Sequence, residues 1–450
     1  MEFLKNIPEN YKIIIDKITK VAKENGFVIY AVGGFVRDII LNRIPNDLDI
    51  MVEGNNGGIE FSKILAEKLN IHQPVIFERF ATSKMIIDEQ EIEFIMPRKE
   101  YYDINSRNPD TEIGSLQQDA LRRDFTVNAL FLRLNDFKLL DLTGKGLQDI
   151  KNKIIRVTDE PSADIIFSQD PLRILRAVRQ SFQLNFSIEE KTYRSMKNNA
   201  SRITIVSGER IRDELNKILL AKTPSKAFLM LDDIGLLNII LPELKQTQNV
   251  EQPIKYHDKD VFNHTMDVVD KIKPDLLLRI TALLHDIAKP QTKTVVDGKI
   301  SFICHEKEGS KIAKNILSRL KYPADFINQV CFLIENHLYP KMYLSSWNDT
   351  SVRKFAHKIG DNLENIKLLN IVDSKKFNDE LFERIENLKQ KDMLMPKKEL
   401  IDGNELIKIF EKPAGKWITE AKEYIKQLQF ENPKITKAQA IKKLKEKFNN

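Results

Sequence analysis

Residues 31–53 constrain the fold of this chain more than any other stretch. The apolar run over 28–32 predicts a strand, which ends at Gly33 and Gly34, and helical spacing of apolar residues follows with Arg37 in the first turn. Two glycines at a strand-to-helix corner leave backbone N–H groups exposed, and these groups favour the binding of phosphate oxygens. Arg37 adds a fixed positive charge. The stretch therefore predicts a phosphate-binding corner.

A pair of carboxylates follows this corner. Asp47 and Asp49 flank one leucine and lead into the apolar run over 50–52, which predicts a second strand. Residues two apart in a strand point to the same side, so both carboxylates face one point. Paired carboxylates beside bound phosphates suit Mg²⁺, which prefers hard oxygen ligands. An isolated Asp-x-Asp is most often a solvated strand edge or turn, and an isolated Gly-Gly is usually a turn. The prediction of a metal and phosphate site therefore rests on the order in which the two motifs occur together.

This order of strand, Gly-Gly, Arg-Asp helix and Asp-x-Asp resembles the nucleotidyltransferase superfamily that includes polymerase beta. The resemblance is to the branch holding bacterial CCA-adding enzymes and poly(A) polymerases, although Asn42 replaces the usual glycine of the Leu-Gly-Arg corner. It implies that Asp47 and Asp49 bind Mg²⁺ and that the Gly33-Gly34 corner and Arg37 bind a nucleoside triphosphate.

Glu93 lies in a third apolar segment, 91–96, that predicts a strand. The strand pattern by itself predicts that the Glu93 side chain faces outward. The family places an acidic residue in this strand, so the resemblance implies a third carboxylate that accepts the proton of an attacking hydroxyl or completes the metal shell. Residues 103–118 are polar and turn-rich, and they predict a loop.

Arg123 and Asp124 precede an apolar segment that predicts a helix, so Asp124 is consistent with an N-cap. The string Arg-Arg-Asp-Phe-Thr-x-Asn-Ala-Leu resembles the second motif of the family. In that motif the arginine before the aspartate meets the triphosphate and the aspartate meets the ribose. The resemblance thus implies these roles for Arg123 and Asp124.

Arginines recur every third residue in the next helical segment, at Arg173, Arg176 and Arg179, with apolar residues on the opposite face. Asp170 and a following proline fit the start of that helix. By periodicity alone, a solvated arginine face is the favoured interpretation. The segment also resembles the family motif described as a protein template for the incoming base.

Physical chemistry makes a template role plausible. Cytosine and adenine both show an amino donor beside a ring-nitrogen acceptor, whereas uracil and guanine reverse both. An aspartate that accepts and an arginine that donates would admit C and A, and Asp170 and Arg173 have those chemistries. Gln169 stands where many relatives have Glu. The segment 208–219, with Glu209, Arg210 and Glu214, resembles the next motif and predicts a bracing helix.

A different chemistry begins at about residue 255, where histidines recur with carboxylates. A lone helical histidine is more often structural, but imidazoles and carboxylates together suit a divalent transition metal and an activated water. The set resembles the HD phosphohydrolase domain that some CCA-adding enzymes carry. An active hydrolase and a retained, idle fold are both open. The implied metal ligands are His264, His285, Asp286, His305, His337 and Asp373.

The segment 393–450 has helical spacing and resembles the tail of bacterial CCA-adding enzymes, although Ala414 interrupts the usual Pro-Gly pair. Its lysines are either a solvated face or phosphate contacts along an RNA stem, which binds by shape and charge. These lysines are Lys434, Lys437, Lys442, Lys443, Lys445 and Lys447.

The chain has 450 residues, room for about three domains. We predict an α+β fold with a small mixed-sheet head, 1–148, then an all-helical neck, 149–250, an HD body, 251–380, and a helical tRNA-binding tail, 381–450. The N-terminus lacks the apolar core of a signal peptide, and charges interrupt every apolar run before it reaches membrane-spanning length. Two cysteines suit a reducing cytoplasm.

The predicted function is template-independent addition of C, C and A to tRNA 3′ ends from CTP and ATP with Mg²⁺. Three alternatives are open. In the first, the chain is a poly(A) polymerase or adds only part of CCA. In the second, its main activity is that of the HD phosphohydrolase, with a second divalent metal. In the third, it is an RNA-binding protein with an inactive head. The intact Asp47 and Asp49 argue against the last.

Overall fold

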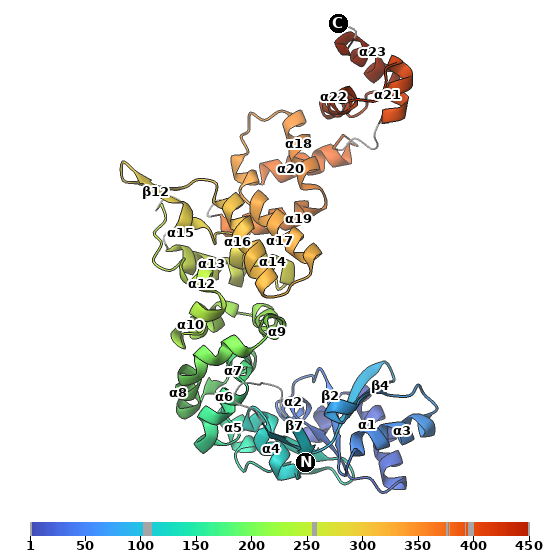
Figure 1. Ribbon diagram of the computed structural model, residues 1–450, viewed down its shortest axis with the longest axis vertical. Coiled ribbons are helices and arrows are strands. Elements are labelled where there is room, and N and C mark those ends of the chain that lie inside the picture. Colours follow the sequence, from blue (N-terminus) through green and yellow to red (C-terminus); the bar gives the residue numbers. More distant parts are fainter. Residues whose placement is uncertain are drawn as a thin grey trace. The chain divides into compact units, whose positions relative to one another are not determined.

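The computed structural model describes residues 2–101, 110–253, 259–374, 377, 379–391, 393–394 and 400–448. It divides into two compact units, Met1–Lys245 and Gln246–Asn450. The first unit holds a mixed sheet with helices, and the described part of the second is helical apart from one hairpin (Figure 1). The predicted α+β class is confirmed. The finer division into four domains stays a prediction. Among the described helices, none has the length and apolar character needed to cross a membrane.

The sheet of the first unit has seven strands in the order β3-β4-β5-β2-β1-β8-β9. Its strands are β1 (Ile29–Val32), β2 (Leu48–Val52), β3 (Val75–Phe77), β4 (Thr82–Ile87), β5 (Gln90–Ile95), β8 (Leu130–Arg133) and β9 (Lys138–Asp141). Within this sheet only β2 and β5 pair in parallel, which requires a long crossover between them. Helix α3 (Gly57–Leu69) lies in this crossover and packs on both strands.

The register of this sheet positions the acidic residues. Asp49 of β2 lies opposite Val32 of β1 on one side and opposite Glu93 of β5 on the other. All four residues of β1 are buried, because β1 is central and paired on both edges. The corner after β1 and the two carboxylates are therefore neighbours.

Two predictions between residues 98 and 133 are corrected. The segment predicted as a loop forms β7 (Asp110–Ile113), paired with β6 (Arg98–Tyr101), and the start of α4 (Leu116–Arg122), while residues 102–109 lie outside the described part. The apolar segment after Asp124 is not a helix: a short 3-10 turn leads into β8. This strand is buried between β1 and β9, and continuous burial suits a central strand as well as a helix.

Helices and two short strands make up the remainder of the first unit. They are α1 (Glu9–Glu24), α2 (Gly34–Ile40), α5 (Gly146–Asn152), β10 (Ile154–Ile155), α6 (Ala163–Gln169), α7 (Leu172–Leu184), β11 (Ser187–Ile188), α8 (Glu190–Asn199), α9 (Gly208–Leu219), α10 (Pro224–Asp233), α11 (Leu237–Ile240) and α12 (Pro242–Lys245). Helix α9 packs on α7, as the sequence predicts for a bracing helix.

The second unit begins with a helical body and a hairpin that the sequence analysis did not predict. Its elements are α13 (Val261–Lys271), α14 (Leu276–Leu284), α15 (Lys289–Thr292), β12 (Lys293–Val296), β13 (Lys299–Phe302), α16 (His305–Arg319), α17 (Ala324–Asn336), α18 (Asp349–Ile359), α19 (Leu363–Asp373) and α20 (Glu380–Gln390). Helices α16 and α17 pack closely along each other, and α14 packs on α17.

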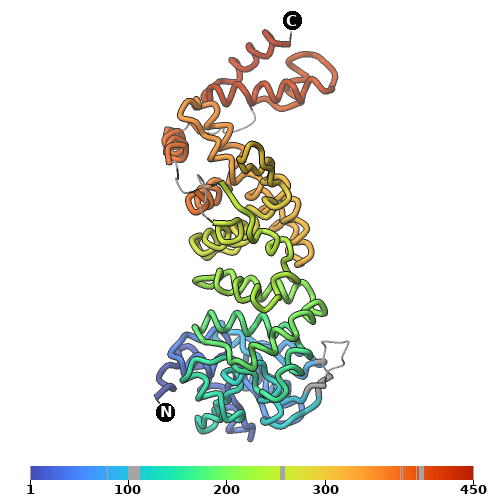
Figure 2. The backbone as a smooth tube through the Cα atoms, turned by 90° about the vertical axis from the view of Figure 1, so that its left-hand side faces the viewer, coloured from blue at the N-terminus to red at the C-terminus, as the bar shows by residue number. Residues whose placement is uncertain are grey.

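The tail consists of α21 (Gly403–Phe410), α22 (Trp417–Glu431) and α23 (Lys437–Phe448), each packed on the next along the chain (Figure 2). Their apolar faces share a small core that includes Ile401, Leu406, Ile425 and Leu444. This separate core explains why the lysines of α23 stay on the outer face of the tail.

Candidate active site

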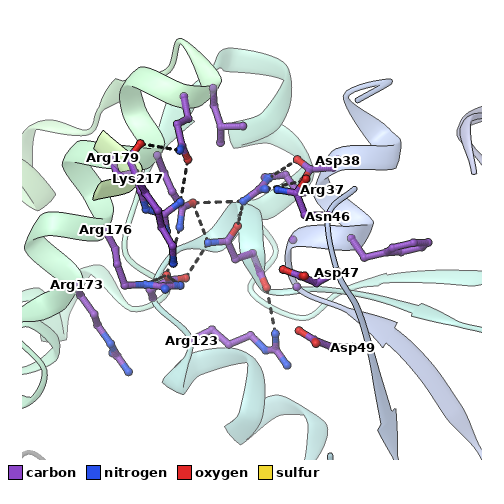
Figure 3. A pocket seen from close by; sticks show the side chains of 18 of the residues that line it. Arg37, Asp38, Asn46, Asp47, Asp49, Arg123, Arg173, Arg176, Arg179 and Lys217 are labelled. Atoms are coloured by element: carbon purple, nitrogen blue, oxygen red, sulfur yellow. Dashed lines mark hydrogen bonds and ion pairs between the residues drawn. The ribbon is translucent and has the colours of Figure 1, made fainter. Parts of the chain in front are cut away.

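A cavity of about 1230 Å³ opens between the sheet and α7 in the first unit. In Figure 3, Asp47 and Asp49 lie on the β2 side, three arginines lie on the α7 side, and Arg37 and Arg123 lie between them. All twelve nucleotide-binding and catalytic residues predicted for the first unit line this cavity. They are Gly33, Gly34, Arg37, Asp47, Asp49, Glu93, Arg123, Asp124, Asp170, Arg173, Arg176 and Arg179.

Gly33 occupies a position that only glycine fits well. Its φ is +73°, a conformation that L side chains rarely adopt. A Cβ there would also lie 3.2 Å from Arg123 Nη1 and 3.9 Å from Asp49 Oδ2. The corner thus brings the backbone close to both an arginine and a carboxylate. Because α2 is only seven residues long, most of the positive charge near this corner comes from Arg37 and Arg123.

Three carboxylates meet on the other wall. Asp49 of β2 is paired in register with Glu93 of β5, and Asp47 directly precedes β2. Burial and the charge of Glu93 raise the pKa of Asp49 to about 6, despite the nearby Arg123. A divalent cation bound between crowded carboxylates of this kind would remove their mutual repulsion. Two of them with substrate phosphates suit Mg²⁺, which rarely takes an all-protein cage.

Acidic partners fix the orientation of Arg37 and Arg123, the two arginines predicted to bind the triphosphate. Arg37 donates from Nε and Nη2 to the two oxygens of Asp38, each at 2.8 Å, and from Nη1 to Asn128 Oδ1 at 2.7 Å. Arg123 donates from Nε to Asp119 Oδ2 at 3.0 Å. The sequence analysis missed Asp119, although its spacing four residues before Arg123 is a signal for an ion pair on a helix.

Asp124 is the buried centre of a hydrogen-bond network and not an N-cap. Its Oδ2 accepts from Arg176 Nε at 2.9 Å and Nη2 at 2.6 Å, and its Oδ1 accepts from Asn128 Nδ2 at 2.8 Å. Burial alone would raise its pKa, but Arg176 and Asn128 hold the pKa of this carboxyl well below its usual range. Gln180 of α7 also bonds Asn128, at 2.9 Å, so the network joins α7 to the segment before β8.

The arginine row of α7 is not a solvated face, so the interpretation favoured by periodicity is wrong. Arg173 is buried and donates from Nη2 to the carbonyl oxygen of Arg122 at 2.7 Å. Arg176 pairs with the buried Asp124. Arg179 donates from Nε to Glu214 Oε2 of α9 at 2.6 Å. Each arginine is positioned by an acceptor from another element.

Asp170 offers an acceptor that the described protein does not use. It lies just before α7 and lines the cavity, and its Oδ1 is buried with no hydrogen-bond partner among the described residues. Its Oδ2 lies 3.5 Å from Arg210 Nη2 of α9, and 4.0 Å from Arg173 Nε. A buried acceptor without a partner is costly, so this oxygen suits a donor on a ligand.

Comparisons with known proteins show the family of this chain. A family described as the poly A polymerase head domain matches residues 29–156, and one described as tRNA nucleotidyltransferase domain 2 matches residues 297–444. The CCA-adding enzyme of Staphylococcus epidermidis is 30% identical over 61% of this chain and 70% of its own length. The chain belongs to the tRNA nucleotidyltransferase family.

Other members of the family differ in what their names say they add. The A-adding tRNA nucleotidyltransferase of Deinococcus radiodurans is 34% identical over 58% of this chain, which spans 60% of that relative's length. The fold is that of a solved Bacillus stearothermophilus CCA-adding enzyme in complex with CTP, with a TM-score of 0.73, 19% identity, and 98% of each chain covered.

The second unit contains the six residues predicted as HD metal ligands. They form two overlapping groups, in each of which the ligand atoms lie within 4.8 Å of one another, and all six residues are buried. The first group is His264, His285, Asp286 and Asp373, and the second is Asp286, His305 and His337.

Three of these histidines share one hydrogen-bond pattern. The Nδ1 atoms of His285, His305 and His337 lie 2.8, 2.8 and 2.6 Å from backbone carbonyl oxygens three residues earlier. A carbonyl oxygen only accepts, so Nδ1 carries the hydrogen and a neutral ring presents the Nε2 lone pair to the cluster. His337 Nε2 is buried without a hydrogen-bond partner in the described protein.

The remaining contacts of the cluster require a positive charge inside it. The Nε2 atoms of His285 and His305 lie 3.1 and 3.3 Å from oxygens of Asp286. Two lone pairs at that distance repel unless a proton or a metal lies between them. Burial disfavours a charged ring, yet Asp286 and Asp373 raise the pKa of His285 to about 10. The donor set suits a divalent transition metal.

Proposed function

We propose that this chain adds C, C and A to the 3′ ends of tRNA, from CTP and ATP, without a nucleic-acid template. The observation that carries the proposal is the unused Oδ1 of Asp170 beside Arg173, in the same cavity as the carboxylates of Asp47 and Asp49. An acceptor and a donor in that arrangement match the shared edge of cytosine and adenine.

The chemistry follows from the positions of the side chains. The Gly33-Gly34 corner, Arg37 and Arg123 hold the triphosphate. The 3′-hydroxyl of the tRNA attacks the α-phosphorus, a new P–O bond forms, and pyrophosphate leaves; Glu93 accepts the hydroxyl proton. Asp47 and Asp49 would hold Mg²⁺, which supplies charge neutralisation at the phosphates when bound.

The tail supports RNA as the second substrate. Lys442, Lys443 and Lys445 are exposed on α23, and Lys447 lies with its Nζ 4.0 Å from the centroid of the Tyr424 ring. Exposed lysines along one helix can neutralise phosphates of an RNA stem with no sequence preference. We place the protein in the cytoplasm, in keeping with its two free cysteines.

One assay tests the proposal and separates it from its nearest alternatives. Purified protein is given tRNA that lacks its whole CCA end, tRNA ending in the first C, and tRNA ending in CC. Each of the four nucleoside triphosphates is supplied alone, and CTP and ATP are also supplied together. Full CCA addition supports the proposal. Addition of A to tRNA-CC alone, of CC alone, or of long A tracts would assign an A-adding, CC-adding or poly(A) enzyme in its place.

We propose a metal-dependent phosphohydrolase as a second function, because six buried candidate ligands converge in the second unit. His285→Ala combined with Asp286→Ala should remove phosphatase and 2′,3′-cyclic phosphodiesterase activity, measured with Mn²⁺, Co²⁺ or Ni²⁺, while nucleotide addition continues. If the wild-type protein hydrolyses neither substrate class with any of these metals, the cluster is structural.

A further inference from the structure

Two lysines reach the carboxylates of the six-residue cluster in the second unit. Lys289 Nζ lies 2.6 Å from Asp286 Oδ2, and Lys341 Nζ lies 2.6 Å from Asp373 Oδ2. Each ammonium thus pairs with one of the two carboxylates that the cluster would offer to a metal. Neither lysine belongs to the set of histidines and aspartates predicted as ligands.

These pairs balance the charge of the cluster before any metal enters. A histidine must be neutral to bind a metal, and in that form of the cluster the two carboxylates and the two ammonium groups leave the site with no net charge. A divalent cation would then bring an uncompensated double charge into a buried site, which is strongly unfavourable. Metal binding therefore requires that an anion enters with the metal or that an ammonium withdraws.

The two lysines differ in how firmly they are held. Lys289 is 6% exposed, donates also to Gln252 Oε1 at 2.6 Å, and lies 5.3 Å from the centroid of the Phe302 ring. The Lys341 side chain is 33% exposed, and it extends from the short 3-10 turn Tyr339–Met342. Lys341 can therefore leave its carboxylate for solvent or for a ligand, whereas Lys289 is fixed.

We propose that Lys341 is the exchangeable counter-ion of this cluster. Without metal its ammonium holds Asp373, and when a divalent metal occupies the cluster it turns to the phosphate of an anionic ligand. A phosphate dianion restores the charge balance that the metal upsets, so metal and phosphate bind cooperatively. The inference rests on the proposed metal site, and it names phosphate monoesters as the ligand class and charge as the source of selectivity.

The test measures binding, so it does not depend on hydrolysis. The full chain carries Asp47→Asn and Asp49→Asn to silence the metal site of the first unit, and Mn²⁺ binding is followed by calorimetry with and without inorganic phosphate. Phosphate should tighten Mn²⁺ binding about tenfold, and Mn²⁺ should tighten phosphate binding by the same factor. Further introduction of His285→Ala should remove the binding assigned to the cluster.

Loss of the lysine charge should change both quantities. Lys341→Met should bind Mn²⁺ more tightly in the absence of phosphate, because no ammonium competes for Asp373. The coupling with phosphate should weaken, because the site with metal then carries one excess positive charge instead of two. Lys341→Gln, a polar and milder change, should behave alike if Lys341→Met misfolds. The matched control is Lys358→Met: Lys358 is exposed and lies against the Tyr339 ring, 4.5 Å from its centroid, so both affinities should match the parent chain.

The outcomes separate this inference from the proposed hydrolase function. If the parent chain binds Mn²⁺ at the cluster but both Lys341 variants keep the same Mn²⁺ affinity and the same coupling, the inference is overturned and the metal site stands. If the parent chain binds no Mn²⁺ that His285→Ala removes, the metal site and the inference both fail.

Discussion

Asp170→Asn is the change that tests base selection most directly. The carboxylate has an unused, buried Oδ1 at the cavity, and its described ion contacts are long, 3.5 Å to Arg210 and 4.0 Å to Arg173. Arg210 is 40% exposed at its side chain, so loss of that pair should cost the fold less than about 1 kcal/mol. The substitution should therefore change recognition far more than stability.

The magnitude follows from the contact that Asp170 would make. An amide presents either an oxygen or an NH₂ group, so it accepts from the amino group of C and A and also donates to the carbonyl of U and G. A contact with a base edge is worth roughly 1–3 kcal/mol of discrimination, which corresponds to about fivefold to 150-fold. The ratio of kcat/KM for CTP over UTP, and for ATP over GTP, should fall by a factor in that range.

The assay is single-nucleotide addition to tRNA with each triphosphate in turn. Glu214→Gln is the matched control, because it is the same carboxylate-to-amide change on α9, where Glu214 braces Arg179 outside the cavity lining. It should slow all four nucleotides alike. If Asp170→Asn also lowers all four by one common factor, Asp170 does not select the base and the template argument is refuted.

Three further outcomes are expected from the same cavity. Asp47→Ala or Asp49→Ala should abolish addition while tRNA binding, followed by filter retention, stays near wild type; substantial residual addition would sink the metal assignment. Since the pKa of Asp49 is raised to about 6, protons should compete with Mg²⁺, and Mg²⁺ affinity should fall as pH drops below that value, by up to about tenfold per pH unit. Glu93→Gln should move the pH at which Mg²⁺ affinity begins to fall to a lower value, because the like charge beside Asp49 is lost. If that pH does not move, the charge of Glu93 is not what raises the pKa of Asp49. Arg176→Met leaves the carboxylate of Asp124 buried without its ion pair, so urea unfolding of the first unit should show a loss of about 3 kcal/mol. Adding Asp124→Asn should recover much of it, and no recovery would show that the arginine stabilises by packing alone.

Local motifs could be predicted from the sequence because their geometry is set by neighbours in the chain. The glycine corner depends on backbone freedom at Gly33, and the pairing of Asp47 with Asp49 depends on strand alternation. Both lie where they were expected, at the cavity. The histidines of the second unit were also found from residue type, although spacing alone says nothing of how closely their rings converge.

Long-range partners could not be predicted in this way. The acceptors that order the arginine row, Asp124 and Glu214, lie 52 and 35 positions from Arg176 and Arg179 along the chain. Periodicity reports only that three arginines share a face, and such a face is usually solvated. The segment after Asp124 was predicted as a helix for a related reason: a short apolar run has the same composition in a buried strand, and only its pairing with β1 and β9 decides.

Because β2 pairs in parallel with β5, the site depends on whether an odd or an even number of residues is lost or gained within β5. Side chains alternate across a sheet, so loss of a single residue inside β5 would carry the carboxylate of Glu93 to the opposite face and set an apolar neighbour beside Asp49. Two residues lost together would restore the face but shift the position along the strand. Insertions in the polar turn between β4 and β5 leave that alternation intact. Natural relatives should therefore vary in length at this turn and almost never within β5.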